Sequence, residues 1–416
     1  MLIKYLNKNS ILFLFLYSTL IIGFFLNEDL NFGAFNDWRG TNLPVIEYLG
    51  NDFKKTILSY DTMGHRHSPI YLIFLSLFYK LGIGPDLIRF INLNFSIVLI
   101  YFFYKCLRLR FGELDKNILI IISFALFLSP TFRSLAIWPD SRLVGLIFFT
   151  ISIYYFLMFQ KYYNVKYFWG CLIFLIISSY LSPNFSLFII FYYFFFLKKI
   201  SNLYLISSVI FCLISAFPAL YYLFVLDINF LVSNIPSGAT GVTALSFNLS
   251  NKIMIISTII FFHYIPFFLS KDVMFEIFNF LKRNIIYLLV FFIINLFFFN
   301  YSTSLTGGGF FFQISNILFK NNYLFYFIVF FSISIIFYYS KNDNLSLLFF
   351  LLLILSNIQS TIYHKYYDPF LLIIYFTILK PEFSQRFMKK KYSVHFIYLF
   401  YLVFIFLRLV KNNFYV

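Results

Sequence analysis

Long apolar runs, separated by short polar segments, follow one another along almost the whole chain. Many of these runs approach or exceed the ~20 consecutive apolar residues that an α-helix needs to cross a bilayer. The pattern predicts an all-α polytopic membrane protein with about 13 transmembrane helices. No polar domain interrupts the runs, so residues 1–416 are expected to form a single integral membrane domain.

The composition agrees with this class of protein. Hydrophobic residues make up 61% of the chain and charged residues 12%, whereas a soluble domain carries about 25% charged residues. The net charge is +16, which in a soluble protein would indicate nucleic-acid binding. Here most basic residues can be assigned to loops on one side of the membrane, as the positive-inside rule expects. No nucleic-acid partner is therefore expected.

The first apolar run, roughly residues 9–26, sets the orientation. Lys4 and Lys8 precede it and predict a cytoplasmic N-terminus, which makes residues 27–86 a large first external loop. Within that loop, residues 69–82 are apolar but short, because ~14 helical residues cover only ~21 Å of a ~30 Å hydrocarbon core. We therefore expect an interfacial helix there.

With that helix in the interface, the later basic loops all fall on the cytoplasmic side. Residues 130–142 then form a second, short external loop, and residues 227–252 form another, whose Gly, Ser, Thr and Asn content predicts flexibility. The expected location is a bacterial-type inner (plasma) membrane, with the active site on its external face. The later cytoplasmic loops carry Lys161, Lys166, Lys198, Lys199, Lys271, Lys282, Arg283, Lys380, Arg386, Lys389, Lys390 and Lys391.

Two external acids beside apolar runs, Asp37 and Asp140, are candidate catalytic residues. A carboxylate in such a place can act as a general base or help to hold a divalent metal ion, which is the one possible cofactor. Simpler interpretations stay open. Asp37 can be a solvated loop residue, and Asp140 can cap the helix that follows it.

Basic side chains accompany these acids on the external side. Arginine binds phosphate oxygens in a bidentate fork, and a phosphate at this level belongs to a lipid headgroup or to a lipid-linked substrate. A metal site built by the neighbouring histidines is weakly supported, since no matching His or Cys cluster lies in that loop. The candidate substrate-binding residues are Arg39, His65, Arg66, His67, Arg133, Arg142 and Lys365.

Three stretches resemble the GT-C glycosyltransferases, the superfamily of protein O-mannosyltransferases and aminoarabinose transferases. The stretch GHRHSPIYLIFLSLFYKLGIGPDLIRFINLNFSIVLIYFFYKCLRLRFG resembles the one that follows their first external loop. LSPTFRSLAIWPDSRLVGLIFFTISIYYFL resembles their second external loop, and HKYYDPFLLIIYF resembles the start of a late span. The likeness covers residues 1–200 well and is thin afterwards.

This resemblance implies a sugar donor carried on a polyprenyl phosphate and an acceptor that is a lipid, a glycan or a protein. It matches Asp37 and Asp140 to the family's first-loop and second-loop acids, and His67 to a residue that helps to bind the donor phosphate. The chain departs from the pattern at Trp38, where members often carry a second acid, and at Ser68, where they carry the first proline of a pair.

Two rival functions stay open. An O-antigen polymerase or ligase also has many spans and external basic loops, but depends mainly on Arg and His. A flippase or other transporter of lipid-linked oligosaccharides tends to carry charged or broken-helix sites near the membrane midplane. The acids of this chain gather at one face and mid-span charges are few, which favours a surface-facing enzyme.

Overall fold

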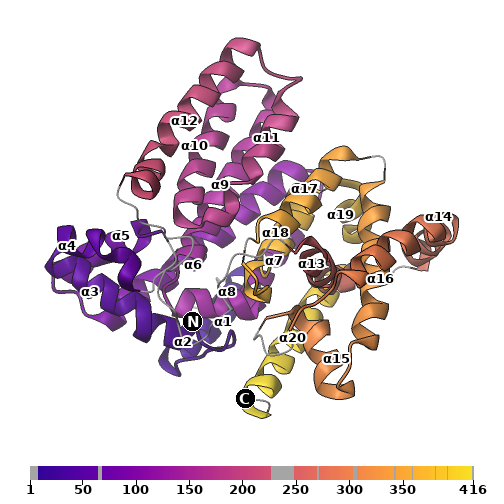
Figure 1. The fold of residues 1–416 in the computed structure, drawn as a ribbon, viewed down its shortest axis with the longest axis horizontal. Helices are drawn as coiled ribbons and strands as arrows, with labels where there is room; N and C mark the ends of the chain where they lie inside the picture. The colour runs from indigo at the N-terminus through magenta and orange to yellow at the C-terminus, as the bar shows by residue number, and fades with distance from the viewer. Residues whose placement is uncertain are drawn as a thin grey trace. The chain divides into compact units, whose positions relative to one another are not determined.

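The computed structural model describes residues 8–63, 68–225, 248–268, 271–302, 307–341, 343–357, 359–379, 381–390 and 392–414 (Figure 1). Helices dominate this part of the chain, and eight are long and apolar enough to cross a membrane. They are α1 (Lys8–Phe25), α6 (Pro85–Arg110), α9 (Ser141–Tyr162), α12 (Asn202–Phe224), α13 (Leu249–Tyr264), α14 (Lys271–Phe297), α16 (Tyr323–Ser340) and α20 (Ser393–Phe414). The all-α polytopic membrane class is thereby confirmed, and the count of 13 spans is not.

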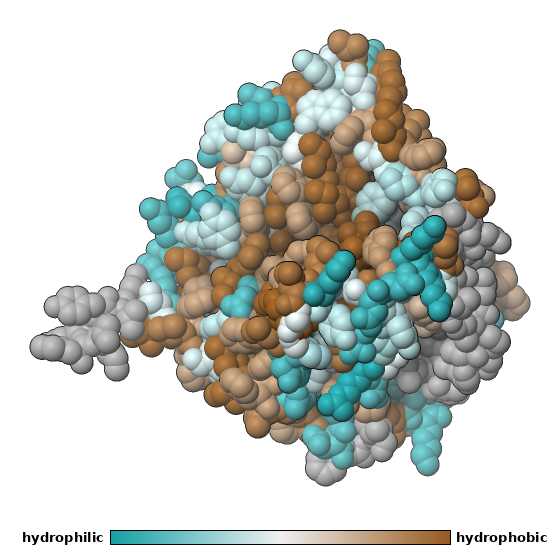
Figure 2. All heavy atoms as spheres, turned by 90° about the vertical axis from the view of Figure 1, so that its left-hand side faces the viewer, coloured by the Kyte–Doolittle hydropathy of each residue, from teal (hydrophilic) through white to brown (hydrophobic). Residues whose placement is uncertain are grey.

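Large apolar side chains remain exposed on the long helices. Phe15 on α1 is 65% exposed, and Phe217 on α12 is 64% exposed. Figure 2 shows one face of the molecule, on which apolar residues cover broad areas between smaller hydrophilic groups. Apolar surface of this extent is suited to lipid tails rather than to water.

The chain divides into two compact units. Unit 1 comprises residues 1–186, 199–237 and 394–416, and unit 2 comprises residues 187–198 and 238–393. Each unit has its own packed helices, and the expectation of a single integral membrane domain over residues 1–416 stays a prediction.

In unit 1, α9 packs along α10 (Val165–Leu181) and α6. The approach of α9 to α10 is close because Gly145 has no side chain; a Cβ there would lie 2.9 Å from the Ser182 Cβ. Ser178 uses this closeness to donate a hydrogen bond to the Gly145 carbonyl at 2.8 Å. The two helices are therefore closely packed, and they hold in place the segments that connect to their ends.

The first loop folds into short helices between α1 and α6. They are α2 (Ala34–Asp37), the π-helix η2 (Trp38–Asn42), α3 (Leu43–Asn51), α4 (Phe53–Leu58), the 3₁₀-helix η3 (Tyr60–Met63) and α5 (Ile70–Lys80). The 11 residues of α5 cover only ~17 Å, too little to cross a bilayer. A short helix is therefore present where residues 69–82 predicted one, and it packs against α3.

The second loop is a buried helix rather than an exposed loop. The chain passes through α7 (Lys116–Phe124) and η4 (Ala125–Leu128), bends by 69°, and continues as α8 (Pro130–Ile137). Ser129 caps α8 by accepting from the Phe132 N–H at 3.1 Å, and Pro130 suits its first position. The cap and the proline start a new helix at this point. Every residue of that helix is buried.

In unit 2, three long helices lie side by side. Asn248, before α13, donates to the Asn300 side chain after α14 at 2.8 Å, so α13 and α14 run in opposite directions. At the other end of α13, the ring of Tyr264 stacks on that of Tyr339 near the end of α16, at 5.1 Å. Residues 226–247 lie outside the described part, and with them most of the predicted flexible loop 227–252, whose last residues are helical.

Two interrupted segments of unit 2 meet partway along α13. A Cβ on Gly309, the first residue of α15 (Gly309–Phe319), would lie 2.8 Å from Ile259, midway along α13. The neighbouring Gly308 donates its N–H to the Ile362 carbonyl at 2.8 Å. Residue 362 belongs to the stretch between α17 (Asn344–Leu355) and α18 (Phe370–Thr377), which has no α-helix and one 3₁₀-helix, η7 (His364–Tyr366).

This stretch contains HKYYDP, whose sequence resembles the start of a late span, and it is largely buried. His364 is 6% exposed and Asp368 is 1% exposed within unit 2. The 12 residues of α17 cover only ~18 Å and the eight of α18 only ~12 Å, so neither crosses a ~30 Å core. The helices α17, α18 and α15 all pack against α13, so this stretch lies in the interior of unit 2.

Candidate functional site

Asp37 stands on the surface of the first loop, at the end of α2. The helix begins after Gly33, whose φ of 99° is a left-handed conformation that favours glycine. Asp29 fixes this start by accepting from the N–H groups of Gly33 at 3.0 Å and Phe35 at 3.1 Å. The Asp37 side chain is exposed, so a carboxylate is presented outward on an anchored helix.

A hydrogen bond joins the first loop to the second. The buried Asn42 donates its side-chain N–H to the Pro139 carbonyl at 2.9 Å. Asn42 follows Asp37 by one turn of π-helix, whose bond runs from the Leu43 N–H to the Trp38 carbonyl. Pro139 directly precedes Asp140, so the two candidate acids lie on segments that contact each other.

Asp140 caps α9, as one of its two interpretations proposes. Its Oδ1 accepts from the Arg142 N–H at 2.9 Å, and its Oδ2 lies 3.7 Å from the Arg142 guanidinium. The two side chains are only 13% and 9% exposed. Burial, together with the negative charge of Asp140, raises the pKa of the Tyr71 phenol. Tyr71 is therefore neutral, and its hydroxyl donates to the side-chain amide oxygen (Oδ1) of Asn92 at 2.5 Å.

Arg89 and Trp138 hold the turn that carries Asp140. The Arg89 guanidinium lies 3.8 Å over the Trp138 ring, and its Nη1 is 3.0 Å from Asp86. Trp138 in turn donates its indole N–H to the Glu28 carbonyl at 2.9 Å. Neither residue was a sequence candidate. An arginine early in an apolar run was the available signal, because such a charge needs a specific partner.

Arg133 is engaged as a structural lock. Two of its nitrogens bind the two Glu28 carboxylate oxygens at 2.6 Å each. The remaining N–H groups donate to Thr19 Oγ1 at 3.1 Å, to the Thr19 carbonyl at 2.9 Å and to the Phe127 carbonyl at 3.3 Å. All five guanidinium donors are used in a 6% exposed side chain. In this arrangement Arg133 has no donor left for a phosphate.

The other predicted basic residues are scattered. Arg39 follows Asp37 by two residues and is exposed, with its guanidinium 4.6 Å over the Phe35 ring. Lys365 belongs to unit 2, where its ammonium lies 5.2 Å over the Tyr363 ring. His65, Arg66 and His67 lie outside the described residues. Arg142 is thus the predicted cation that the structure brings beside one of the two acids, Asp140.

Metal ligation finds little support in the described part of the chain, where no group of three or more His, Cys, Asp or Glu side chains could hold an ion. A histidine pair in unit 2 is the nearest approach to such a group. His263 and His364 are buried and face each other, with their Nε2 atoms 2.9 Å apart. One ring donates and the other accepts at this contact, so the two nitrogens cannot both carry a proton.

Comparisons of the chain with protein-family models, with curated proteins and with solved structures find no match. The likeness to GT-C glycosyltransferases therefore rests on the motifs of the sequence, and the assignment of a reaction to this site is a proposal.

Proposed function

We propose that this protein is a membrane glycosyltransferase of the GT-C type. It moves a sugar from a polyprenyl-phosphate-linked donor to a hydroxyl of a lipid, glycan or protein acceptor on the external (periplasmic) face. The observation that supports this best is the hydrogen bond from Asn42 to the Pro139 carbonyl. That bond brings the segment of Asp37 against the segment of Asp140, the two acids that the resemblance matches to the family's first and second external loops.

In this mechanism Asp37 is the general base. An acceptor hydroxyl is a weak nucleophile, and the exposed Asp37 carboxylate takes its proton as the oxygen attacks the anomeric carbon. The new carbon–oxygen bond forms on the face opposite the breaking bond to phosphate oxygen, so the configuration inverts. The phosphate leaves with the electron pair, and its negative charge needs nearby cations.

Arg39 and Arg142 supply positive charge near the acids, with His67 as a further donor-binding residue implied by the resemblance. Asp140 acts as a positioning residue, because it caps α9 and holds the Arg142 guanidinium at 3.7 Å. Arg133 is left out of the mechanism because Glu28 and Thr19 occupy it.

The proposal includes a bacterial-type inner membrane, a cytoplasmic N-terminus and an external first loop. Its basis is the positive-inside rule applied to the basic loops. The long apolar helices supply a lipid-facing wall along which a polyprenyl chain can lie.

The test is a comparison of cellular glycans and lipids by mass spectrometry in a deletion strain complemented with single variants. Asp37→Asn should remove a defined sugar from a product while protein levels stay normal. Glu47→Gln is the matched control, since Glu47 is an acid of the same loop, on α3. A strain carrying Asp37→Asn that makes the full wild-type product would exclude Asp37 as the base.

One observation favours a second candidate, a transporter of lipid-linked saccharides. Broken helices with irregular buried backbone are typical of transporter binding sites, and unit 2 has such a junction where Gly308 binds the Ile362 carbonyl. A transporter defect leaves the saccharide complete but on the wrong side of the membrane. The same mass spectra therefore separate the two functions, because only the transferase loses a sugar.

A further inference from the structure

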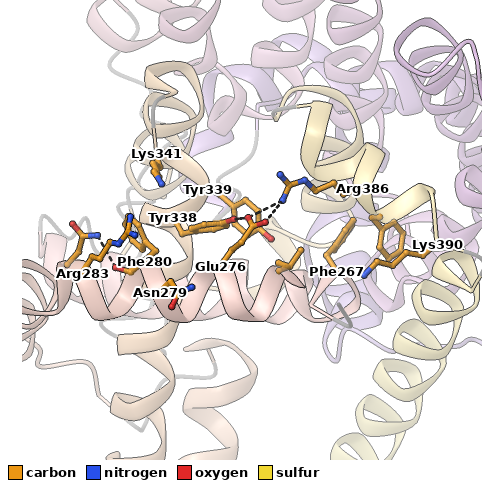
Figure 3. A pocket seen from close by; sticks show the side chains of 13 residues that line it. Phe267, Glu276, Asn279, Phe280, Arg283, Tyr338, Tyr339, Lys341, Arg386 and Lys390 are labelled. Carbon is orange, nitrogen blue, oxygen red and sulfur yellow. Dashed lines mark hydrogen bonds and ion pairs between the residues drawn. The ribbon is translucent and has the colours of Figure 1, made fainter. Parts of the chain in front are cut away.

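Unit 2 contains a cavity of about 820 Å³ where α14, the end of α16 and α19 (Pro381–Met388) come together (Figure 3). Its charged and hydroxyl-bearing lining includes Glu276, Arg283, Tyr338, Lys341, Arg386 and Lys390. The cavity is distinct from the site of Asp37 and Asp140, which belongs to unit 1.

The lining of this cavity is strongly basic. Four cations and one carboxylate face it, which gives a formal charge of 4 − 1 = +3. The carboxylate is already engaged, since Glu276 accepts from Arg386 at 3.0 and 3.1 Å and from the Tyr338 hydroxyl. Figure 3 shows these three side chains, which come from α14, α16 and α19, meeting one another. A cationic ligand is therefore disfavoured, and an anion would find basic groups that the one carboxylate cannot neutralise.

Aromatic and apolar side chains form most of the rest of the cavity, together with Asn279 and Asn284. The rings of Phe267 and Phe387 meet at 4.6 Å, and both line it. Beside it, the outer surface of α14 exposes Phe275 (67%) and Phe278 (63%), which alternate with the polar lining residues of the same helix. Such a site suits a ligand with a charged head and an apolar chain.

The position of the cavity also fits a membrane interface. Arg283 and Arg386 belong to two separate basic stretches of the sequence, both of which the positive-inside rule places on the cytoplasmic side. In the structure Arg283 lies in the first half of α14 and Arg386 on α19, and both line the same cavity. Basic pockets between helices on that side of a membrane are suited to phosphate-bearing lipid headgroups.

We propose that this cavity binds the phosphate-bearing headgroup of an anionic membrane lipid, which the positive charges of Arg283, Arg386 and Lys390 along the lining attract, with the apolar chain lying along α14. Arginine forks and lysine point charges are both used for phosphate oxygens. The proposal is independent of sugar transfer, because it concerns other residues in the other unit.

The experiment uses the full-length protein in nanodiscs of phosphatidylcholine, with or without ten per cent phosphatidic acid, and measures lipid retention by native mass spectrometry. The double variant Arg283→Gln/Lys390→Gln should retain phosphatidic acid about tenfold more weakly, since two of the four cations of the lining are lost. The matched control is Lys282→Gln/Lys389→Gln. It removes the same charge from the adjacent, exposed positions that do not line the cavity.

A gain-of-binding variant guards against misfolding as an explanation. Glu276→Gln raises the formal charge of the lining from +3 to +4, so phosphatidic acid should be retained more strongly, a result that an unfolded protein cannot give. Equal weakening by the two double variants, or unchanged retention in Glu276→Gln, would overturn the site.

Inorganic phosphate added to the phosphatidylcholine samples distinguishes the source of the ligand. A lipid site predicts that millimolar phosphate raises the unfolding temperature little and displaces phosphatidic acid poorly. Stabilisation by inorganic phosphate alone, lost in Arg283→Gln/Lys390→Gln, would keep the phosphate chemistry and overturn the lipid as its source.

Discussion

Two arginines, one in each unit, show how partners determine what a buried or exposed charge does. Arg133 in unit 1 meets a bidentate carboxylate and three further oxygens, and only 6% of it is exposed. Arg386 in unit 2 shares one carboxylate, and its side chain is 57% exposed beside other cations. The first arrangement is complete without a ligand, whereas the second leaves positive charge over. Surplus charge at an accessible cavity, rather than the presence of arginine, indicates a binding site.

The largest effect should come from breaking the Arg133–Glu28 pair. Replacing Glu28 with Gln leaves a buried guanidinium without its carboxylate, and removing one partner of a buried pair costs about 3–5 kcal/mol. Chemical unfolding of the detergent-solubilised protein measures this loss. A stability equal to that of the wild type would mean that Arg133 is not locked, and would return it to the set of phosphate-binding candidates.

A smaller effect is expected at Asn42, which is buried but uncharged. Asn42→Leu keeps the approximate size of the side chain and removes its donor, so the Pro139 carbonyl loses its partner at a cost of about 1–3 kcal/mol. Product formation should fall together with stability, since the segments of Asp37 and Asp140 separate. Full activity in this variant would show that the contact between the loops is not needed for the reaction.

Two variants at Asp140 separate its role as a helix cap from the role of its negative charge. Asp140→Ala should cost about 1 kcal/mol through loss of the cap, whereas Asp140→Asn keeps the cap and should cost little. Asn nevertheless removes the negative charge that holds Arg142. Loss of product in the stable Asn variant would assign a role to the charge, and normal product would reduce Asp140 to a helix cap.

The smallest stability effect is expected at Arg386. Its ion pair with Glu276 is exposed, and such pairs contribute about 0–1 kcal/mol. Arg386→Gln should therefore unfold almost as the wild type does, while retention of phosphatidic acid falls. A destabilisation as large as that of Glu28→Gln would erase the contrast between the two arginines and give Arg386 a structural role.

The class of the fold could be predicted from the sequence, because membrane helices depend on local apolar runs. The short helix α5 and the cap at Asp140 are likewise local features. The lock of Arg133 could not be predicted, since its partner Glu28 is 105 residues away. For the same reason, the sequence did not indicate that Asn42 would bind the Pro139 carbonyl.

Tertiary packing also determines which polar or irregular segments are buried. Residues 130–137 contain charged and polar side chains, yet they form a buried helix because Glu28 neutralises Arg133 and Ser129 caps the start. Residue 362 lies inside unit 2 because the glycines before α15 allow the two backbones to meet. Long-range partners of this kind leave no periodic pattern in the sequence.

The π-helix between Asp37 and Asn42 has a consequence for insertions and deletions. A π-turn holds one residue more than an α-turn, so the five-residue spacing here corresponds to a four-residue spacing of an ordinary helix. Deletion of Gly40 should therefore be tolerated, because the segment can close into an α-helix that keeps both side chains on one side. The same deletion within the regular helix α3 would rotate the following residues by about 100°. The first loop thus contains a position at which chain length can change without altering the direction of its acid.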